Sequence, residues 1–230
     1  MRETKAEIIA VHGWGFDSSC WATWKDILDN SYSIDFFERG YLGKSKRTPF
    51  FSSLQGPKII FTHSFGLHLC PVSLFSETDL LVIFNGFVEF HPVAAQYRRR
   101  SKLVVRQMLN ALEEQPEKVL HNFYKNTFHP MAYSRPQKPI TDKKLLIKDL
   151  QNLDTQTFDI RVLKSVNKIC ILHGSKDAIV PYRKGRELHG LFPGRAKYLE
   201  VKDAGHALPF THAHQCRQFV EPEIKNPIAP

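Results

Sequence analysis

The segment Lys58-Ile-Ile-Phe-Thr-His-Ser-Phe-Gly66 predicts the architecture of this chain. Its first five residues form a mostly apolar, β-branched run, which is typical of a strand buried on both faces of a sheet. A strand, a sharp turn and a helix in succession expose a serine hydroxyl at the tip of the turn, beside the next backbone N–H. We therefore predict that Ser64 is a nucleophile. Thr62 departs from the usual Gly-x-Ser-x-Gly pattern, because it replaces the first glycine.

Similar apolar runs recur along the chain, separated by stretches that suit crossover helices, such as Cys20–Asp29 and Tyr182–Leu191. Strands that alternate with helices predict an α/β fold with a mostly parallel central sheet flanked by helices, joined by right-handed connections. The expected strands are Glu7–Val11, Tyr32–Phe37, Lys58–Thr62, Leu80–Phe84, Lys168–His173 and Lys197–Val201.

The segment from residue 87 to residue 157 interrupts this alternation with three helical patterns. These are Gln96–Glu113, Glu117–Phe128 behind Pro116, and a third helix with Thr141 as its N-cap. The interruption divides the chain into a core, residues 1–86 and 158–230, and a helical insertion, residues 87–157. A helical insertion late in an α/β sheet predicts a lid, and an ordinary packing subdomain is the alternative.

Composition limits the class of protein. A chain of 230 residues with 42% apolar and 24% charged residues suits one domain with a single core. No stretch approaches the ~20 apolar residues that cross a bilayer, and we find no secretory signal. Four widely spaced cysteines, two of them in or beside apolar runs, predict buried reduced thiols and a cytoplasmic protein.

The net charge of +9 could indicate an acidic partner, a membrane surface or nucleic acid. The sequence lacks a zinc-finger spacing, an RNA-recognition signature and a Gly-rich phosphate loop. We therefore expect no nucleic-acid or membrane partner and no cofactor, and we expect a monomer.

Three further motifs follow predicted strands. His12-Gly-Trp-Gly15 is a Gly-rich turn whose N–H groups can face a developing oxyanion. His173-Gly-Ser-Lys-Asp177 offers a carboxylate that can orient an imidazole. Asp203-Ala-Gly-His-Ala207 offers a histidine, the side chain whose pKa suits a general base at neutral pH. Each motif alone has a simpler interpretation as a tight turn, a turn aspartate or a solvated histidine.

The order of the four motifs along the chain is specific, although each motif alone is not. An oxyanion turn followed by Ser, Asp and His is the chain order of α/β-hydrolases, and not that of chymotrypsin-like or subtilisin-like proteins. All four motifs end at the same edge of a parallel sheet, where such folds bind ligands. We therefore predict a catalytic triad of Ser64, Asp177 and His206. Asp203 is the alternative carboxylate, although only two residues lie between it and His206.

Other histidines are expected to play no part in proton transfer. His63 and His68 flank the serine, where they would line or support the pocket. His206, His212 and His214 could suggest a metal, but no cysteine or carboxylate accompanies them at a zinc-binding spacing. We predict no metal site.

The chain resembles the pimeloyl-[acyl-carrier protein] methyl ester esterases of biotin synthesis, within the α/β-hydrolase superfamily. The resemblance implies an α/β-hydrolase fold, here with a trimmed N-terminus because the usual N-terminal hairpin is missing. It also implies a serine carboxylesterase with Ser64 as nucleophile, His206 as base, Asp177 as acid, and the backbone N–H groups of Trp14 and Phe65 as oxyanion hole. The residues that carry the resemblance are His12-Gly-Trp-Gly15, Asp35…Gly43-Lys-Ser45, Asp159-Ile-Arg161, Asp177…Val180-Pro181 and Gly205-His-Ala…Pro209-Phe210…His212.

The implied substrate is the methyl ester of pimeloyl-[acyl-carrier protein]. Residues near the motifs predict an apolar acyl pocket, with His12, Phe16, Phe87 and Phe210 as substrate contacts. From Val88 to Thr155, twelve Lys/Arg face seven Asp/Glu, a net charge of +5 that would steer an acidic carrier protein. The expected docking residues are Arg98, Arg99, Arg100, Lys102 and Arg106.

The same triad could serve other reactions, because one fold hosts many chemistries. A small-ester esterase, a thioesterase and a C–C bond hydrolase are the alternative enzymes. A non-catalytic scaffold of the same fold is the alternative from another class.

Overall fold

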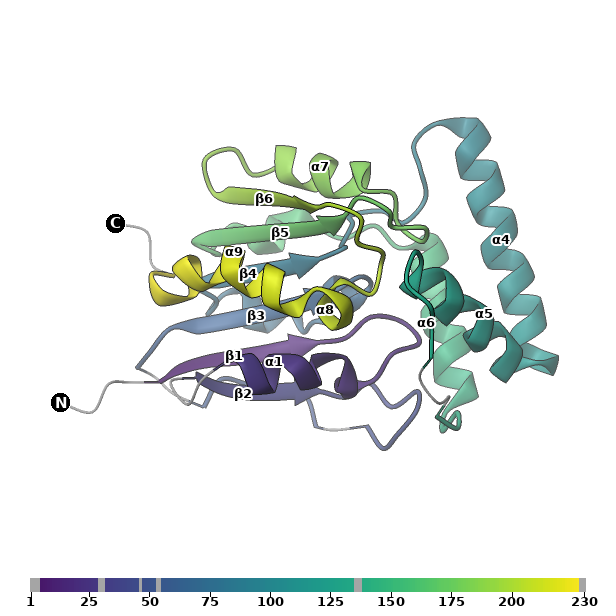
Figure 1. Cartoon of the computed structure of the whole chain (residues 1–230), viewed down its shortest axis with the longest axis horizontal. Helices are drawn as coiled ribbons and strands as arrows, with labels where there is room; N and C mark the ends of the chain where they lie inside the picture. Colours follow the sequence, from purple (N-terminus) through teal and green to yellow (C-terminus); the bar gives the residue numbers. More distant parts are fainter. Residues whose placement is uncertain (1–4, 29–31, 46, 53–54, 135–137, 228–230) are drawn as a thin grey trace.

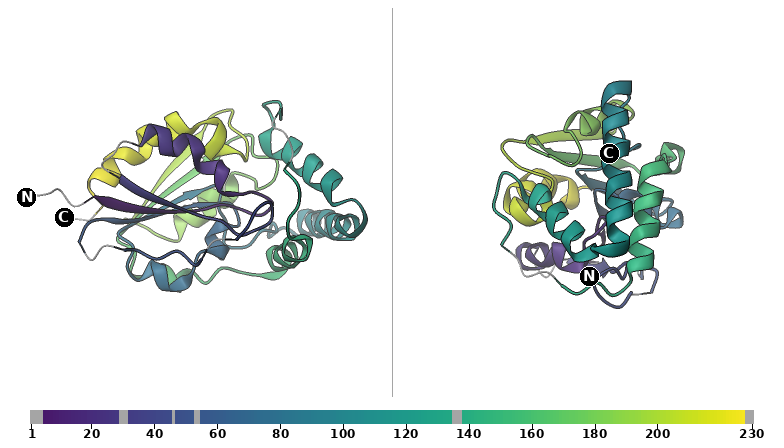
Figure 2. Two further views of the ribbon diagram at one scale, coloured as in Figure 1. Left: turned by 90° about the horizontal axis from the view of Figure 1, so that it is seen from below. Right: turned by 90° about the vertical axis from the view of Figure 1, so that its right-hand side faces the viewer.

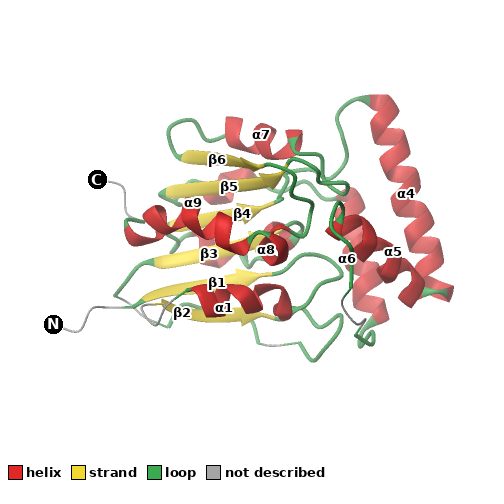
Figure 3. Cartoon of the chain, in the orientation of Figure 1, coloured by secondary structure: helices red, strands yellow, loops and turns green. Residues whose placement is uncertain are grey.

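A computed structural model of the chain describes residues 5–28, 32–45, 47–52, 55–134 and 138–227. Six parallel strands form one sheet in the order β2-β1-β3-β4-β5-β6 (Figures 1 and 3). The parallel sheet and all six predicted strands are confirmed, each end within one residue of its expected position. The strands are β1 (Ala6–Val11), β2 (Tyr32–Phe37), β3 (Lys58–His63), β4 (Leu80–Phe84), β5 (Lys168–Gly174) and β6 (Ala196–Val201).

Helices cover both faces of the sheet, which is why its strands are apolar almost throughout. Side chains alternate along each strand, so that Ile59 and Phe61 of β3 join one core and Ile60 joins the other. The first face is covered by α1 (Ala22–Ile27), α8 (Leu208–Thr211) and α9 (Ala213–Lys225). The second face is covered by α2 (Gly66–Leu69), α3 (Val72–Phe75), η2 (Ile160–Leu163) and α7 (Arg183–Gly190).

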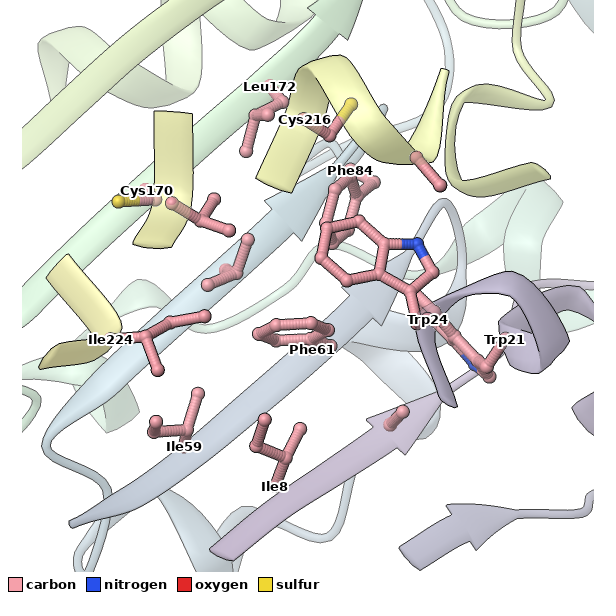
Figure 4. Close-up of a cluster of buried hydrophobic side chains, with 14 of the residues drawn as sticks. Ile8, Trp21, Trp24, Ile59, Phe61, Phe84, Cys170, Leu172, Cys216 and Ile224 are labelled. Carbon is pink, nitrogen blue, oxygen red and sulfur yellow. The ribbon is translucent and has the colours of Figure 1, made fainter. Parts of the chain in front are cut away.

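The four cysteines are free and buried, as predicted. Cys170 of β5 and Cys216 of α9 lie in the first core (Figure 4). No helix within the described residues has the length and apolar character needed to cross a membrane.

The predicted helical insertion forms three helices beside the carboxyl edge of the sheet (Figures 1 and 2). They are α4 (Ala95–Glu114), α5 (Pro116–Phe128) and α6 (Lys143–Thr155). The prediction of Thr141 as N-cap of the third helix is wrong: Asp142 caps α6 by accepting a hydrogen bond from the Leu145 N–H at 2.9 Å. The first crossover is also shorter than predicted, because a 3-10 turn, η1 (Ser18–Trp21), precedes α1. The predicted end of that helix, Asp29, lies outside the described residues.

Hydrogen bonds and an ion pair fasten α5 and α6 to the core. The indole N–H of Trp14 donates to the Leu146 carbonyl on α6 at 2.8 Å, and the Ala207 N–H donates to the Thr127 carbonyl on α5 at 2.9 Å. Asp149 of α6 is fully buried and accepts from Arg39 at 2.7 and 2.9 Å and from the Tyr41 hydroxyl at 2.7 Å. These contacts fix two of the three helices relative to the sheet. The division into core and lid stays a prediction.

Trp24 joins α1 to the centre of the first core (Figure 4). Its ring meets those of Phe61 and Phe84 edge-on at centroid distances of 5.0 and 5.3 Å. Its indole N–H donates to the Pro209 carbonyl at 3.1 Å. Edge-on aromatic contacts and a satisfied N–H are favourable for a buried tryptophan.

We expect Trp24→Ala to lower the free energy of unfolding by about 3–5 kcal/mol, because it leaves a cavity and an unpaired carbonyl. Val72→Ala is the matched control: Val72 is 59% exposed on α3, and its loss should change stability by less than about 0.5 kcal/mol. Urea denaturation of both variants measures the difference. Similar losses in the two variants would contradict the role of Trp24.

Candidate active site

Ser64 lies at the turn between β3 and α2, in a strained backbone conformation. Its φ of +55° falls in the left-handed region, which non-glycine residues avoid. Its N–H donates to the Phe84 carbonyl at 2.8 Å, which ties the turn to the neighbouring strand β4. A strained serine between a strand and a helix is the geometry of a nucleophile elbow, as the sequence predicts.

Two glycines let the elbow meet the turn after β1. A Cβ on Gly66 would lie 2.5 Å from the Val11 carbonyl oxygen, and one on Gly13 would lie 2.9 Å from the His63 carbonyl oxygen. Both distances are too short for any side chain, so the two turns pack backbone to backbone. Thr62, which replaces the first glycine of the usual pattern, is fully buried, and its hydroxyl has no hydrogen-bond partner among the described residues.

Three predicted residues meet at this edge of the sheet. The Ser64 hydroxyl lies 2.9 Å from His206 Nε2, and His206 Nδ1 lies 2.7 Å from Asp177 Oδ2. Because the carboxylate can only accept, His206 carries its proton on Nδ1 and Nε2 is free to accept the serine proton. The alternative acid, Asp203, occupies a turn at φ +59°, and within the described chain it makes no contact with His206.

The Asp177 carboxylate accepts several hydrogen bonds in a site closed to solvent. Oδ1 accepts from the N–H groups of Ile179 and Val180, both at 2.8 Å. Burial alone would raise the pKa of Asp177, but the charge of His206 and hydrogen bonds from His173 and His206 outweigh burial. The pKa of Asp177 therefore lies well below its usual range, and the side chain is an anion at neutral pH.

His63 and His68 support the site, as expected. His63 donates from Nε2 to the His206 carbonyl at 2.8 Å, and burial followed by the charge of His206 lowers its pKa to about 3. His68 donates to the Phe87 carbonyl at 3.1 Å, and burial lowers its pKa to about 4. Both rings stay neutral at physiological pH and donate to backbone carbonyls. No group of three His, Cys, Asp or Glu among the described residues could hold a metal ion.

A cavity of about 1120 Å³ opens above Ser64. Trp14 and Ser64 form its floor, and α4, α5, α6 and the loop after β5 form its walls. The apolar part of the wall includes Val104, Val105, Met108, Val119, Phe123, Leu150, Leu153 and Ile179. The polar rim includes Arg100, Asn122, Asn126, Arg183 and Glu187.

The four predicted substrate contacts do not line this cavity. His12 is fully buried, where its Nε2 accepts from the Arg39 N–H at 3.0 Å. Phe16 and Phe210 border a separate void of about 60 Å³, and Phe87 packs against His68 and Phe90. One feature of the sequence indicates this wall, because Val104, Val105 and Met108 fall on one face of the expected helix Gln96–Glu113.

The five predicted docking residues lie on α4 but differ in their surroundings. Arg98 is ion-paired with Glu89, and the Lys102 ammonium lies 3.9 Å from Asp154. Arg100 lines the cavity. Arg99 and Arg106 are exposed, and neither has an ion-pair partner in the described part of the chain. These two are the arginines most available to an anionic partner.

No protein-family model matches this chain, and no curated protein matches its sequence. Solved structures match it closely in three dimensions. An esterase from Thermogutta terrifontis superimposes with a TM-score of 0.70 at 15% identity, over 98% of this chain and 92% of that one. An enol-lactonase from Burkholderia xenovorans gives a TM-score of 0.73 at 16% identity, over 98% and 94% of the two chains. A bromoperoxidase from Bacillus anthracis gives 0.73 at 17% identity, over 96% and 92%.

These matches establish the architecture. The likeness extends over nearly the whole of each chain, so this six-stranded parallel sheet with its flanking helices adopts the α/β-hydrolase fold. At these identities the likeness concerns the fold alone.

We expect Gly66→Ala to lower the free energy of unfolding by about 1–3 kcal/mol, because the new methyl group would force the two turns apart. Gly43→Ala is the matched control, since a Cβ there meets no atom within 4 Å and its backbone has no positive φ. That substitution should change stability by less than about 1 kcal/mol. Urea denaturation compares the two, and equal stability would show that the turns do not need their close approach.

Proposed function

We propose that this protein is a serine carboxylesterase with Ser64, His206 and Asp177 as its catalytic triad. The observation that carries the proposal is the chain of contacts at 2.9 and 2.7 Å from the strained serine through the imidazole to the buried carboxylate. A cavity large enough for an acyl ester opens directly above that serine. These features together match the requirements for covalent acyl transfer.

Acylation begins when the Ser64 hydroxyl attacks the ester carbonyl carbon and His206 Nε2 takes the hydroxyl proton. The carbonyl oxygen becomes an oxyanion, and the N–H groups of Trp14 and Phe65 are the proposed donors to it. Neither N–H donates to a backbone carbonyl within the described residues, so both are available. The intermediate then collapses, and the alcohol leaves with the proton from His206.

Deacylation repeats these steps with water as the nucleophile. His206 takes a proton from water, the hydroxide attacks the acyl-enzyme, and Ser64 leaves with the proton to regenerate its hydroxyl. Asp177 holds its negative charge throughout and stabilises the imidazolium that forms in both halves. Its depressed pKa keeps it ionised for this role.

We further propose that the substrate is the methyl ester of pimeloyl-[acyl-carrier protein]. The apolar wall suits the acyl chain, and the cavity mouth carries exposed apolar side chains, including Tyr97 at 58% and Val104 at 47% exposure. Arg99 and Arg106 stand on the outer side of the same helix, where an acidic carrier protein would dock. We also propose that the protein is a monomer and that it acts in the cytoplasm, as the sequence analysis predicts.

The triad predicts a large and specific effect of substitution. Ser64→Ala should lower kcat for p-nitrophenyl butyrate by at least ~10³-fold, and Asp177→Asn by up to ~10⁴-fold, with both folds intact. Asp203→Asn is the matched control and should remain close to wild type, because Asp203 does not contact His206. Circular dichroism checks the fold. Near-wild-type turnover by Ser64→Ala would disprove the proposed nucleophile.

The docking arginines predict an effect that depends on substrate. Arg99→Ala/Arg106→Ala should lower kcat/KM roughly 5-fold for the carrier-linked ester and leave a small free ester unaffected, because rim charges act on encounter. Raising the ionic strength from ~0.05 to ~0.5 M should produce the same selective loss, as the Debye length falls from about 14 to about 4 Å.

Lys164→Ala is the control for this test, because Lys164 is exposed just before β5, at the opposite edge of the sheet. It should leave both substrates unaffected. Equal losses on both substrates in the double variant would indicate a damaged α4, and no loss on either would remove the charge argument for a carrier protein.

A further inference from the structure

Asn85 occupies the carboxyl end of β4 in a conformation that side chains rarely adopt. Its φ is +51°, and the residue is fully buried. Asparagine tolerates this left-handed region better than most residues. Its strand, β4, pairs with β5, whose following loop carries Asp177, and β5 in turn pairs with β6, whose following loop carries His206.

The Asn85 amide joins these two loops. Its Nδ2 donates to Asp177 Oδ2 at 2.5 Å and to the Gly205 carbonyl, immediately before His206, at 3.2 Å. Both partners are acceptors only, so the group that faces them is the NH₂ and not the carbonyl. The Asn85 Oδ1 is buried without a hydrogen-bond partner among the described residues. An unpaired buried carbonyl is unfavourable for folding, so stability alone does not explain the residue.

We propose that Asn85 is a positioning residue that holds the Asp177 carboxylate and the His206 loop in the register required for proton transfer. This inference rests on the proposed esterase activity. Asp177 Oδ1 is held by two backbone N–H groups, and Oδ2 faces His206, Asn85 and, at 3.2 Å, His173. The hydrogen bond from Asn85 prevents Oδ2 from turning away from His206. The second hydrogen bond of the same amide holds the Gly205 carbonyl in place.

The amide also shares the charge of the carboxylate. The charged and titratable groups that face His206 are Asp177 and His63, whose ring centroid lies 5.0 Å away, and His173 reaches the triad through Asp177. Without the Asn85 donor, Oδ2 would direct more of its negative charge to the imidazolium. The acid limb of the activity profile would then move to higher pH.

Two substitutions separate this role from a structural one. Asn85→Gly removes the donor but accepts the same backbone conformation. It should lower kcat at least 10-fold with little change in KM, and it should raise the midpoint of the acid limb of kcat/KM by half a pH unit or more. Asn85→Asp keeps the shape but places a second carboxyl group against Asp177. The pair should share one proton, so activity should persist while that proton is held and fall as the pH rises enough to remove it.

Asp203→Gly is the matched control, because Asp203 also has a positive φ at this edge of the sheet but does not touch the triad. This substitution should leave the acid and basic limbs of the kcat/KM profile at their wild-type pH values. Profiles of kcat/KM against pH with p-nitrophenyl butyrate measure all three variants. A proton NMR spectrum follows the His206 imidazole N–H independently of turnover, and its resonance should move in Asn85→Gly.

The possible results test the positioning role of Asn85 and the proposed esterase activity separately. An inactive wild-type protein would overturn the proposed esterase, whatever the variants do. An active wild type with unmoved limbs and an unmoved His206 resonance in both Asn85 variants would overturn the positioning role alone. A uniform loss of activity without a shifted limb would likewise reduce Asn85 to a structural residue. If Asn85→Gly fails to fold, the isosteric Asn85→Asp still tests the inference through its high-pH loss.

Discussion

The close approach between the turn after β1 and the turn after β3 is the constraint on which the site depends. Gly66 and Gly13 have no side chains, and each would meet the opposite turn at 3.0 Å or less if it had one. Because the turns touch, Trp14 and Ser64 line the same cavity, and the proposed oxyanion donors, the N–H groups of Trp14 and Phe65, belong to these two turns. The proposed oxyanion hole thus depends on backbone packing. The sequence contributes to it mainly through Gly13 and Gly66, which allow the two turns to approach each other.

The helical segment is tied to the same turns. Trp14 belongs to the β1 turn and bonds to α6, while Ala207 follows the proposed base and bonds to α5. A shift of either helix would therefore disturb the floor of the cavity. The α4 helix is tied to α6 instead, since the His91 ring joins Ser101 of α4, at 2.8 Å, to Asp154 of α6, at 2.9 Å.

Sequence reasoning succeeded where a single local rule decides the answer. Apolar runs predicted every strand, and the rule that ligand-binding residues follow the carboxyl ends of parallel strands brought Ser64, Asp177 and His206 together. The same rule applied to Asn85, directly after β4, would have found it. It went unnoticed because an asparagine after a strand is also an ordinary turn residue.

The walls of the cavity could not be predicted in the same way. Which face of α4 or α6 meets the cavity depends on the angle at which each helix crosses the sheet, and no local pattern encodes that angle. His12 and Phe16 illustrate the error, since both are close to the motifs in sequence, but His12 is buried beside Arg39 and Phe16 borders a separate void. Nearness along the chain was a poor guide once the chain turned sharply at Gly13 and Gly15.

The backbone of Ser64 has an evolutionary consequence. A left-handed conformation is unfavourable for a serine by about 1 kcal/mol or more, and a glycine would adopt it freely. Drift toward higher stability would therefore tend to erase the proposed nucleophile, while retention of the hydroxyl maintains a residue that the fold itself disfavours. A lineage released from selection for this chemistry should lose its serine early and keep its sheet.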